Sequence, residues 1–200
     1  MPTFSEEFIA ESGAVLAAVD PQQLEHCAEG LAAVRAKNGR LFILGVGGSA
    51  GHASHAVNDF RKICGFEAYS PTDNVSELTA RINDDGWDTA LSAWLNGSRL
   101  GASDGLLVLS VGGGNAAQAI SVNLVSAMDL ALERGTAIFG IVGRDGGYTR
   151  KVATACVVIP PLFDDHVTPH TEGLCSVLWH LLVSHPLLTV HTTKWESTQL

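Results

Sequence analysis

The sequence contains no long hydrophobic run, and this excludes a membrane-spanning helix. None of its apolar stretches approaches the roughly 18 residues that a membrane-spanning helix requires. The first residues, MPTFSEEFIAESG, carry glutamates and lack the basic segment that opens a secretory signal peptide. We therefore expect a cytoplasmic protein with no membrane partner.

Cysteine is scarce, and basic residues are outnumbered by acidic ones. The four cysteines are far apart and form no C-x-x-C pair, so we expect reduced thiols and no disulfides: Cys27, Cys64, Cys156 and Cys175. The 12 lysines and arginines face 21 aspartates and glutamates, which gives a net charge of −9 at pH 7. Because nucleic acids and anionic membranes attract basic surfaces, we expect no nucleic-acid partner. Because the net charge is negative, an anionic ligand has to be bound by groups at its own site and not by the overall charge of the protein.

The residues that are present alternate as in an α/β domain. With 200 residues, 46% of them hydrophobic, the chain is long enough for one domain with a full core. Apolar segments predict strands at 41–46, 105–111, 136–143 and 155–160, with FEAYS at 66–70 as a further candidate. Helical patterns start near residues 51, 115 and 171, after 143, and within 83–105. This order predicts a parallel sheet with helices on both faces.

Two helices are expected before the first strand. Ser5 is a candidate cap for a helix that reaches about Val19. The segment Asp20-Pro21-Gln22-Gln23 then has an N-cap aspartate, proline at the first helical position and glutamine at the third. This second helix is expected to end near Asn38-Gly39.

A glycine-rich turn follows at least two of the predicted strands. LFILGVGGSAGHASHAV and LLVLSVGGGNAAQAISV both read as strand, turn and helix, and AIFGIVGRDGGYTRKV is a looser third copy. Such turns expose backbone N–H groups at a helix N-terminus, where a phosphate is favoured. Glycine also simply permits a tight turn, but the repetition, with Ser49 in one copy and Ser110 and Asn115 in the other, favours ligand binding.

A dinucleotide site is an alternative reading of the first turn. Residues 45–50, GVGGSA, satisfy G-x-G-x-x-A, and Glu67 lies at a suitable distance along the chain to hold a ribose hydroxyl. However, Glu67 does not end a convincing second strand, and two helices precede the first strand. The following helix also carries histidines and an aspartate that a pyrophosphate site does not use.

Two pairs of polar residues indicate an acid/base or metal site. His55 and Asp59 are four residues apart and share one helix face, while Glu172 and His180 are eight apart in the last helix. A surface hydrogen bond and a buried core histidine are the alternatives. The two negative charges of the carboxylates balance the charge of a divalent cation, and the two imidazoles are neutral. This ligand set suits zinc or another first-row metal.

The segments GGSAGHASHAVNDF, SVGGGN, GRDGG and TEGLCSVLWHLLVSHP together resemble the sugar isomerase (SIS) domain family, of the phosphoheptose isomerase type. The resemblance covers nearly the whole chain, 1–200, as a single SIS domain in which residues 1–39 are helices on the core or at a subunit interface. It implies a five-stranded parallel sheet flanked by helices, and a homotetramer with sites between subunits. The implied activity is conversion of sedoheptulose 7-phosphate to D-glycero-D-manno-heptose 7-phosphate.

The resemblance also implies roles for individual residues. Ser49 and Ser110 match serines of the two phosphate loops. His55 and Asp59 match a histidine and a catalytic glutamate, and Glu172 and His180 match a glutamine and a catalytic histidine. Some family members bind zinc with this four-residue set. The remaining substrate contacts implied or expected are an Asn-Asp pair bordering the sugar, Asn83 and Asp84, and the second loop with Gly112, Gly113 and Asn115.

The sequence departs from the family at four places. Asp59 is one methylene shorter than glutamate, and Glu172 adds a negative charge, which favours a bound divalent metal, zinc first. The second loop lacks the usual hydroxyl side chains, so backbone N–H groups are expected to hold phosphate there. The segment from Asn115 is longer than expected, which predicts an extra helical turn.

The expected chemistry is proton transfer through an enediolate. Asp59 is the candidate base at carbon 1 of the open-chain ketose, and His180 is the candidate acid at carbon 2. A metal on the four-residue set is the other arrangement, and the residues leave both open. Two further functions also remain open: a sugar-phosphate sensor or assembly partner without catalysis, and a nicotinamide-dependent enzyme. For His166 and His170, a solvated or interface role is preferred over a substrate contact.

Overall fold

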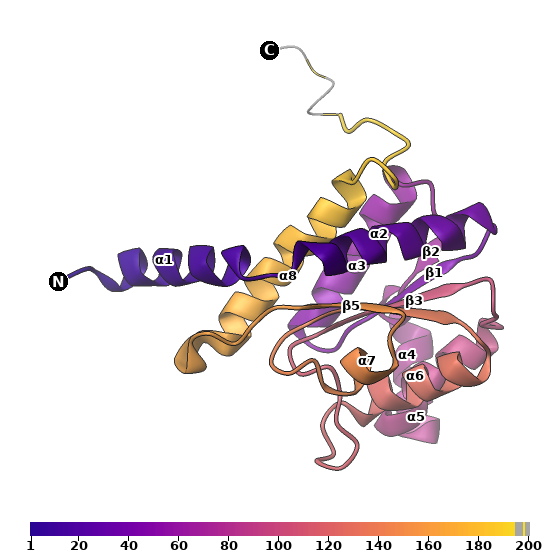
Figure 1. Cartoon of the computed structure of the whole chain (residues 1–200). Coiled ribbons are helices and arrows are strands. Elements are labelled where there is room, and N and C mark those ends of the chain that lie inside the picture. The colour runs from indigo at the N-terminus through magenta and orange to yellow at the C-terminus, as the bar shows by residue number, and fades with distance from the viewer. Residues whose placement is uncertain (195–197, 199–200) are drawn as a thin grey trace.

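A five-stranded sheet forms the centre of the computed structural model, which describes residues 1–194 and 198 (Figure 1). The spatial order is β2-β1-β3-β4-β5, and every neighbouring pair is parallel. The strands are β1 (Leu41–Leu44), β2 (Ala68–Tyr69), β3 (Gly105–Ser110), β4 (Ala137–Val142) and β5 (Ala155–Val158). The predicted five-stranded parallel sheet is therefore confirmed.

Helices cover both faces of the sheet, as Figure 1 shows. One face carries α2 (Pro21–Ala36), α3 (Gly48–Lys62) and α8 (Val167–Ser184); the other carries α4 (Val75–Asp85), α5 (Trp87–Gly97), α6 (Val122–Glu133) and α7 (Gly147–Val152). Each face has its own cluster of buried side chains, with Phe139 in one and Phe42 in the other. Because both faces are covered, β1 and β3 are buried along their whole length, as their apolar sequences require.

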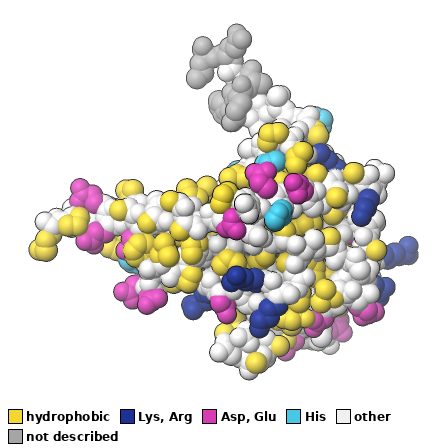
Figure 2. Space-filling model, viewed as in Figure 1, with side chains coloured by type: hydrophobic (Ala, Val, Ile, Leu, Met, Phe, Trp, Pro, Cys, Tyr) yellow, Lys and Arg dark blue, Asp and Glu magenta, His cyan; other side chains and the backbone are white. Residues whose placement is uncertain are grey.

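The N-terminal helix α1 (Phe4–Ala17) extends away from the rest of the molecule (Figures 1 and 2). It begins with a capping box formed by Thr3 and Glu6, so its N-cap lies two residues before the expected cap, Ser5. Its side chains include exposed hydrophobic ones, with Phe4 67% and Ile9 71% accessible. Its contacts with η2 (Asp164–His166) and α8 run from Phe4 to Ser12 along one side of the helix.

The second helix follows the sequence prediction closely. The Asp20 side chain accepts a 2.9 Å hydrogen bond from the backbone N–H of Gln22, and Pro21 is the first helical residue. The helix ends at Ala36, just before the expected Asn38-Gly39. Within the described residues, no helix is both long enough and apolar enough to cross a membrane.

The helix predicted from Asn115 begins instead at Val122. Asn115 and Ile120 pair through two backbone hydrogen bonds of 2.8 and 2.9 Å, which close a loop. Ala119 and Ser121 adopt left-handed conformations, with φ of 54° and 47°, that a helix cannot continue through. The extra residues of this segment therefore form a loop and not an extra helical turn.

Other helix boundaries also differ from the prediction. The region 83–105, read as one helix, contains the end of α4 and the whole of α5, divided by Gly86 at φ 84°. Helix α3 begins at Gly48, three residues early, and α8 begins at Val167 instead of Thr171 because the 3-10 turn η2 (Asp164–His166) leads directly into it.

Candidate active site

A cavity of about 690 Å³ lies at the carboxyl ends of β1, β3 and β4. The strand order reverses between β1 and β3, and ligands of open parallel sheets bind at this reversal. The lining residues come from the loops after these strands and from α8: Val46, Ser49, Ser110, Val111, Gly112, Asn115, Gln118, Ile120, Ser121, Arg144, Asp145, Gly147 and Glu172. The three glycine-rich turns found in the sequence thus meet at one cavity.

The first turn leads directly into α3. Gly47 has φ of 62° and precedes the helix, which has no side-chain cap on its first N–H groups. A side chain on Gly45 would collide with the backbone of Ser49, since the ideal Cβ position is 2.2 Å from the Ser49 oxygen. Ser49 itself is 6% exposed and faces the cavity. The turn therefore presents backbone N–H groups and one hydroxyl to an anion.

The second and third turns are bonded to each other. The Gly113 carbonyl accepts hydrogen bonds from both the backbone N–H and the hydroxyl of Thr149, at 2.9 and 2.8 Å. Gly113 also donates its N–H to the Ser110 hydroxyl oxygen at 3.0 Å, which leaves the Ser110 proton available to a ligand. Gly112 lines the cavity, whereas Gly113 acts through these bonds behind it.

The loop that replaces the predicted helix start borders the same cavity. Asn115 Oδ1 accepts from the Gln118 backbone N–H at 3.1 Å, and Asn115 Nδ2 donates to the Gln118 side chain at 3.1 Å. Both side chains line the cavity. Asn115 is thus an expected ligand residue that also holds the loop in shape.

Arg144 is a cavity residue to which the sequence analysis assigned no role. It lies in the third turn, GRDGG, with φ of 53°, and its side chain packs near Gly112. Within the described part of the chain, its guanidinium makes no hydrogen bond or ion pair to an acidic side chain. A guanidinium is well suited to a phosphate, so the motif GRDGG could have indicated this residue.

Glu172 also lines the cavity, and its carboxylate lies against the first turn. A Cβ built on Gly48 would stand 2.7 Å from Glu172 Oε1, so the carboxylate lies close against the first residue of α3. A carboxylate is stabilised at a helix N-terminus by the macrodipole. It also places a negative charge where a phosphate is expected.

Three of the four expected metal ligands come together on α3 and α8. His55 Nε2 and His180 Nε2 each lie 3.7 Å from Asp59 Oδ2, and the ligand atoms of the three side chains are all within 4.8 Å of one another. Glu172 is not part of this group, because it turns toward Gly48. The structure thus brings the two predicted polar pairs together through three of their members.

Hydrogen bonds fix which atoms of this group face one another. His180 Nδ1 lies 2.7 Å from the Ser176 carbonyl oxygen, which can only accept, so Nδ1 carries a proton. In the neutral ring, Nε2 therefore presents a lone pair toward Asp59. Asp59 receives a 2.7 Å hydrogen bond from Asn58 on its other oxygen, Oδ1. A proton or a cation between Nε2 and Oδ2 satisfies both groups.

His55, Asp59 and His180, called the acid/base group below, lie further along α3 and α8 than the residues that line the cavity. Ser49 precedes His55 by six residues of α3, about 9 Å of axial rise. Glu172 precedes His180 by eight residues of α8, about 12 Å. The three side chains are therefore offset from the cavity residues by about two helical turns along both helices. Both histidines are accessible in this chain, His55 at 57% and His180 at 45% of their side chains.

Two expected substrate residues and one expected ribose contact lie elsewhere. Asn83 and Asp84 are in the last turn of α4, bonded to each other at 2.8 Å, and do not line the cavity. Glu67 precedes β2, accepts a 2.9 Å hydrogen bond from the Tyr69 hydroxyl, and is also outside the cavity. The first turn therefore lacks the acidic partner that a dinucleotide site uses.

Comparisons with known proteins agree with this arrangement. No family model matches the chain. It is 30% identical over 193 residues to the lincomycin biosynthesis protein LmbN of Streptomyces lincolnensis, a match that covers 92% of this chain and 66% of LmbN, so the chain spans about two thirds of that relative. It is also 30% identical over 150 residues to the phosphoheptose isomerase of Rhodospirillum rubrum, with coverage of 72% and 73%.

A solved structure extends the likeness to the fold. The phosphoheptose isomerase GmhA of Neisseria gonorrhoeae superimposes with a TM-score of 0.78 at 25% identity, over 91% of this chain and 98% of that chain. The shared elements include the parallel sheet that carries the three turns. On these grounds the chain belongs to the phosphoheptose isomerase type of SIS-domain proteins.

Proposed function

We propose that this protein is an aldose–ketose isomerase that converts sedoheptulose 7-phosphate to D-glycero-D-manno-heptose 7-phosphate. The observation that carries the proposal is the facing of His180 Nε2 and Asp59 Oδ2 at 3.7 Å, two helical turns beyond a cavity suited to phosphate. Membership of the phosphoheptose isomerase family supports this choice of substrate.

The phosphate binds at the meeting point of the three turns in this proposal. Ser49 and Ser110 donate hydroxyl protons, the Gly112 region contributes backbone N–H groups, and Asn115 donates through its amide. Arg144, in the third turn, adds a positive charge to the cavity lining. Holding the far end of a long substrate at this point orients its reacting carbons at the acid/base group.

The proton transfers follow from the groups at the other end. Asp59, held by Asn58, removes a proton from carbon 1 of the open-chain ketose, and the resulting enediolate carries the charge on its oxygens. His180, in its imidazolium form, then delivers the Nε2 proton to carbon 2, while the proton on the carbon 1 oxygen passes to the carbon 2 oxygen. This leaves a neutral ring whose remaining proton, on Nδ1, is bonded to the Ser176 carbonyl. An imidazole can both donate and accept a proton, so His180 can take part in both directions of the reaction.

The same residues fit a divalent metal, zinc first. His55, Asp59 and His180 offer two nitrogens and one oxygen within 4.8 Å, a donor set typical of zinc sites. When bound, the ion supplies Lewis-acid polarisation of the carbonyl and stabilises charge on the enediolate. Glu172 as a fourth ligand stays a prediction, because its carboxylate rests against Gly48.

A homotetramer with sites between subunits is part of the proposal. It is supported by the accessibility of His55 and His180, and by the exposed hydrophobic side chains on the projecting helix α1 (Figure 2). In such an assembly, a neighbouring subunit is the source of contacts expected from Asn83 and Asp84. We treat residues 1–200 as one SIS domain, with helices 1–39 packing on the core or at the subunit interface. The four buried free thiols support a cytoplasmic location.

Proton NMR in deuterated water tests the proposal directly. Sedoheptulose 7-phosphate is incubated with the protein as purified, after chelation, and after zinc is restored. We expect an aldose signal together with carbon-bound deuterium, both lost in Asp59→Asn. His52→Gln is the matched control, since His52 lies on the same helix but outside the group. Binding of the substrate with neither aldose nor exchange in any sample would overturn the assignment for this sugar and favour a sensor or a different sugar phosphate as substrate.

A further inference from the structure

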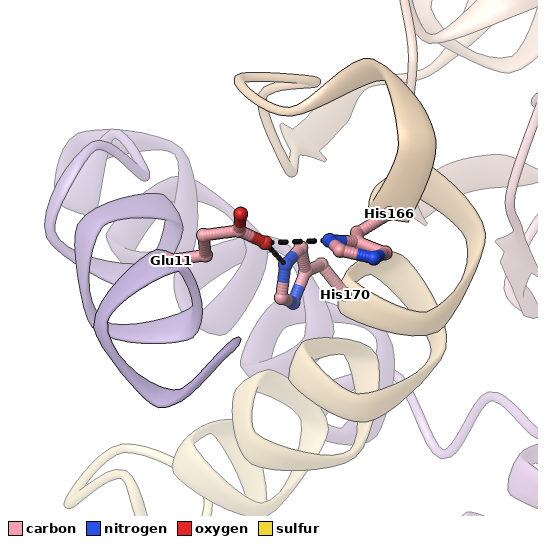
Figure 3. A group of neighbouring side chains, drawn as sticks. All are labelled: Glu11, His166 and His170. Atoms are coloured by element: carbon pink, nitrogen blue, oxygen red, sulfur yellow. Dashed lines mark hydrogen bonds and ion pairs between the residues drawn. The ribbon is translucent and has the colours of Figure 1, made fainter. Parts of the chain in front are cut away.

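A second group of metal-ligand side chains lies where the middle of α1 packs against η2 and the start of α8. Figure 3 shows Glu11 of α1 pointing between His166 of η2 and His170 of α8. Glu11 Oε2 is 2.7 Å from His166 Nδ1 and 2.9 Å from His170 Nε2. The three ligand atoms lie within 4.8 Å of one another. The group thus joins the first helix to residues more than 150 positions later in the chain.

Hydrogen bonds around His170 determine where its protons are. The Ser12 hydroxyl donates its single proton to the Phe8 carbonyl at 2.9 Å. Ser12 Oγ therefore accepts at its 3.2 Å contact with His170 Nδ1, which must carry a proton. In the neutral ring, Nε2 then has a lone pair, and it faces a carboxylate oxygen at 2.9 Å. A lone pair on His170 Nε2 and a Glu11 carboxylate oxygen repel each other at this distance, so a proton or a metal cation has to lie between them.

We propose that Glu11, His166 and His170 bind a divalent first-row cation, best matched by Zn²⁺, which fastens α1 to the start of α8. Two imidazole nitrogens and one carboxylate oxygen are preferred zinc donors. A cation satisfies the facing acceptors of Glu11 and His170 at the same time. Ser12 then acts as the outer partner that orients a ligating histidine, an arrangement common to protein zinc sites.

The surroundings allow a cation to enter and to be held. Ligand atoms about 2.1 Å from a tetrahedral zinc stand about 3.4 Å apart, so Glu11 has to withdraw by only about half an ångström. The Glu11 side chain is 21% exposed and His166 29% exposed, whereas His170 is 3% exposed. One histidine is therefore fixed in the interior, and the other two ligands can adjust at the surface.

Aromatic rings pack against the two histidines of the group. The Phe8 ring centroid lies 4.5 Å from that of His170 and 5.4 Å from that of His166. The Phe163 ring centroid lies 6.1 Å from that of His170. Such a shell restricts water and strengthens the attraction between a cation and its ligands.

This group is separate from the candidate active site. His170 and His180 are ten residues apart on α8, about 15 Å of axial rise. Neither Glu11 nor His166 lines the substrate cavity. The inference therefore does not depend on the proposed isomerase activity.

Cobalt titration tests the site in a protein whose other candidate metal group, formed by His55, Asp59 and His180, has been removed by substitution. The protein carrying His55→Ala and His180→Ala is stripped with chelator and titrated with Co²⁺, whose visible absorption reports inner-sphere ligands. We expect one Co²⁺ per chain, displaced by Zn²⁺, and a higher melting temperature with either ion. Adding His166→Gln or Glu11→Gln is expected to remove both the absorption and the thermal shift. Ser12→Ala is expected to weaken the affinity about 10-fold.

His185→Gln is the matched control for this experiment. His185 Nε2 lies 3.1 Å from Glu25, so it is another histidine–carboxylate pair that links an N-terminal helix to the end of α8, but with only one histidine. We expect this variant to bind Co²⁺ like its background. Circular dichroism of His166→Gln, whose side chain is partly exposed, checks that the fold is kept.

Two results would overturn the proposal. The first is a background protein that binds no Co²⁺, with a melting temperature that zinc leaves unchanged; a proton then holds Glu11 and His170 together. The second is equal Co²⁺ binding by the background and by His166→Gln and Glu11→Gln. Isomerase activity of the otherwise unmodified chain carrying His166→Gln is a separate readout, so failure here is distinguishable from failure of the proposed function.

Discussion

Nε2 of His180 lies 3.7 Å from Oδ2 of Asp59, and Nδ1 of the same ring is committed to the Ser176 carbonyl. The backbone of α8 thereby selects the nitrogen that is available for chemistry. Asp59 is oriented in the same way by Asn58, which leaves one oxygen for the histidines. Asp59 and His180 can therefore be assigned different proton transfers, and substitutions of the two residues should have different effects on proton exchange and on product formation.

Replacement of His180 is expected to separate two events that Asp59→Asn abolishes together. In His180→Gln, Asp59 still removes the carbon 1 proton, so exchange of that proton with deuterated water continues. The aldose product falls by about 10²- to 10⁴-fold, because delivery to carbon 2 is lost. Proton NMR of sedoheptulose 7-phosphate measures both quantities. Equal loss of exchange and product in the two variants would contradict the assigned roles.

Glu172→Gln is expected to tighten binding of inorganic phosphate by about tenfold at low ionic strength, with a smaller gain in high salt. The substitution removes a negative charge that lies against Gly48, at the same helix end where phosphate is proposed to bind. Isothermal titration calorimetry measures the change. Glu133→Gln, at an exposed position on α6, serves as the control for net charge. Unchanged affinity would place the phosphate away from the first turn.

Gly113→Ala is expected to lower the free energy of unfolding by at least about 2 kcal/mol. Gly113 has φ of 70°, and a Cβ there would stand 2.0 Å from the Gly146 carbonyl oxygen, which is backbone and cannot move aside cheaply. Urea denaturation measures the loss. Gly51→Ala is the comparison, because nothing lies within 4 Å of its Cβ position in α3. That variant should gain up to about 1 kcal/mol.

Acid is expected to weaken the fold partly through Asp104, whose carboxylate accepts from Arg40 Nη2 at 2.7 Å. Burial alone raises the pKa of Asp104, but the hydrogen bonds from Arg40 and Gly101 outweigh it and hold that pKa below its ordinary value. The stabilisation is therefore complete above the unfolded pKa of about 3.9 and is lost as pH falls through the lower folded pKa.

Unfolding by urea at several pH values checks the contribution of this pair. At pH 7, Asp104→Asn should cost about 2 kcal/mol, and its stability should fall less steeply below pH 4 than that of the unmodified protein. The exposed pair of Glu77 and Arg81 is the control, since Glu77→Gln should change stability by only about 0.5 kcal/mol. Parallel acid profiles for Asp104→Asn and the unmodified chain would contradict the prediction.

The cysteines are expected to resist thiol reagents in the folded protein. All four are buried, and burial raises the pKa of the Cys27, Cys64 and Cys175 thiols to about 12 and that of Cys156 to about 11. At pH 8 hardly any thiolate forms, and reagent access requires unfolding. Labelling with a chromogenic disulfide should be slow in buffer and reach four thiols per chain in denaturant. Rapid labelling of one thiol in buffer would disprove this expectation.

The sheet and the three turns could be predicted from sequence because their signals are local. Runs such as LFIL and GLLVLS are apolar on both sides of the strand, as strands buried on both faces must be. The Asp20-Pro21 start of α2 was equally clear, since the cap and the proline act within one helical turn. Family resemblance then connected these local patterns to one arrangement.

Other features depend on contacts that no local pattern shows. The segment 115–121 has a helical sequence pattern but forms a loop, because the backbones of Asn115 and Ile120 pair with each other. The side chains of these two residues give no sign of this backbone pair. Glu172 has the spacing of a ligand to His180, yet its carboxylate settles against the end of α3. The pairing of Glu11 with His166 and His170 joins distant segments and could not be read from either one.

The two hydrogen bonds from Thr149 to the Gly113 carbonyl have a consequence for how such proteins diverge. A substitution in either the second or the third turn alters the geometry that the other requires. Natural variants are therefore expected to change residues 110–114 and 143–149 together, as one inherited block. Specificity for a new sugar phosphate is then reached most readily by exchanging both segments at once between relatives.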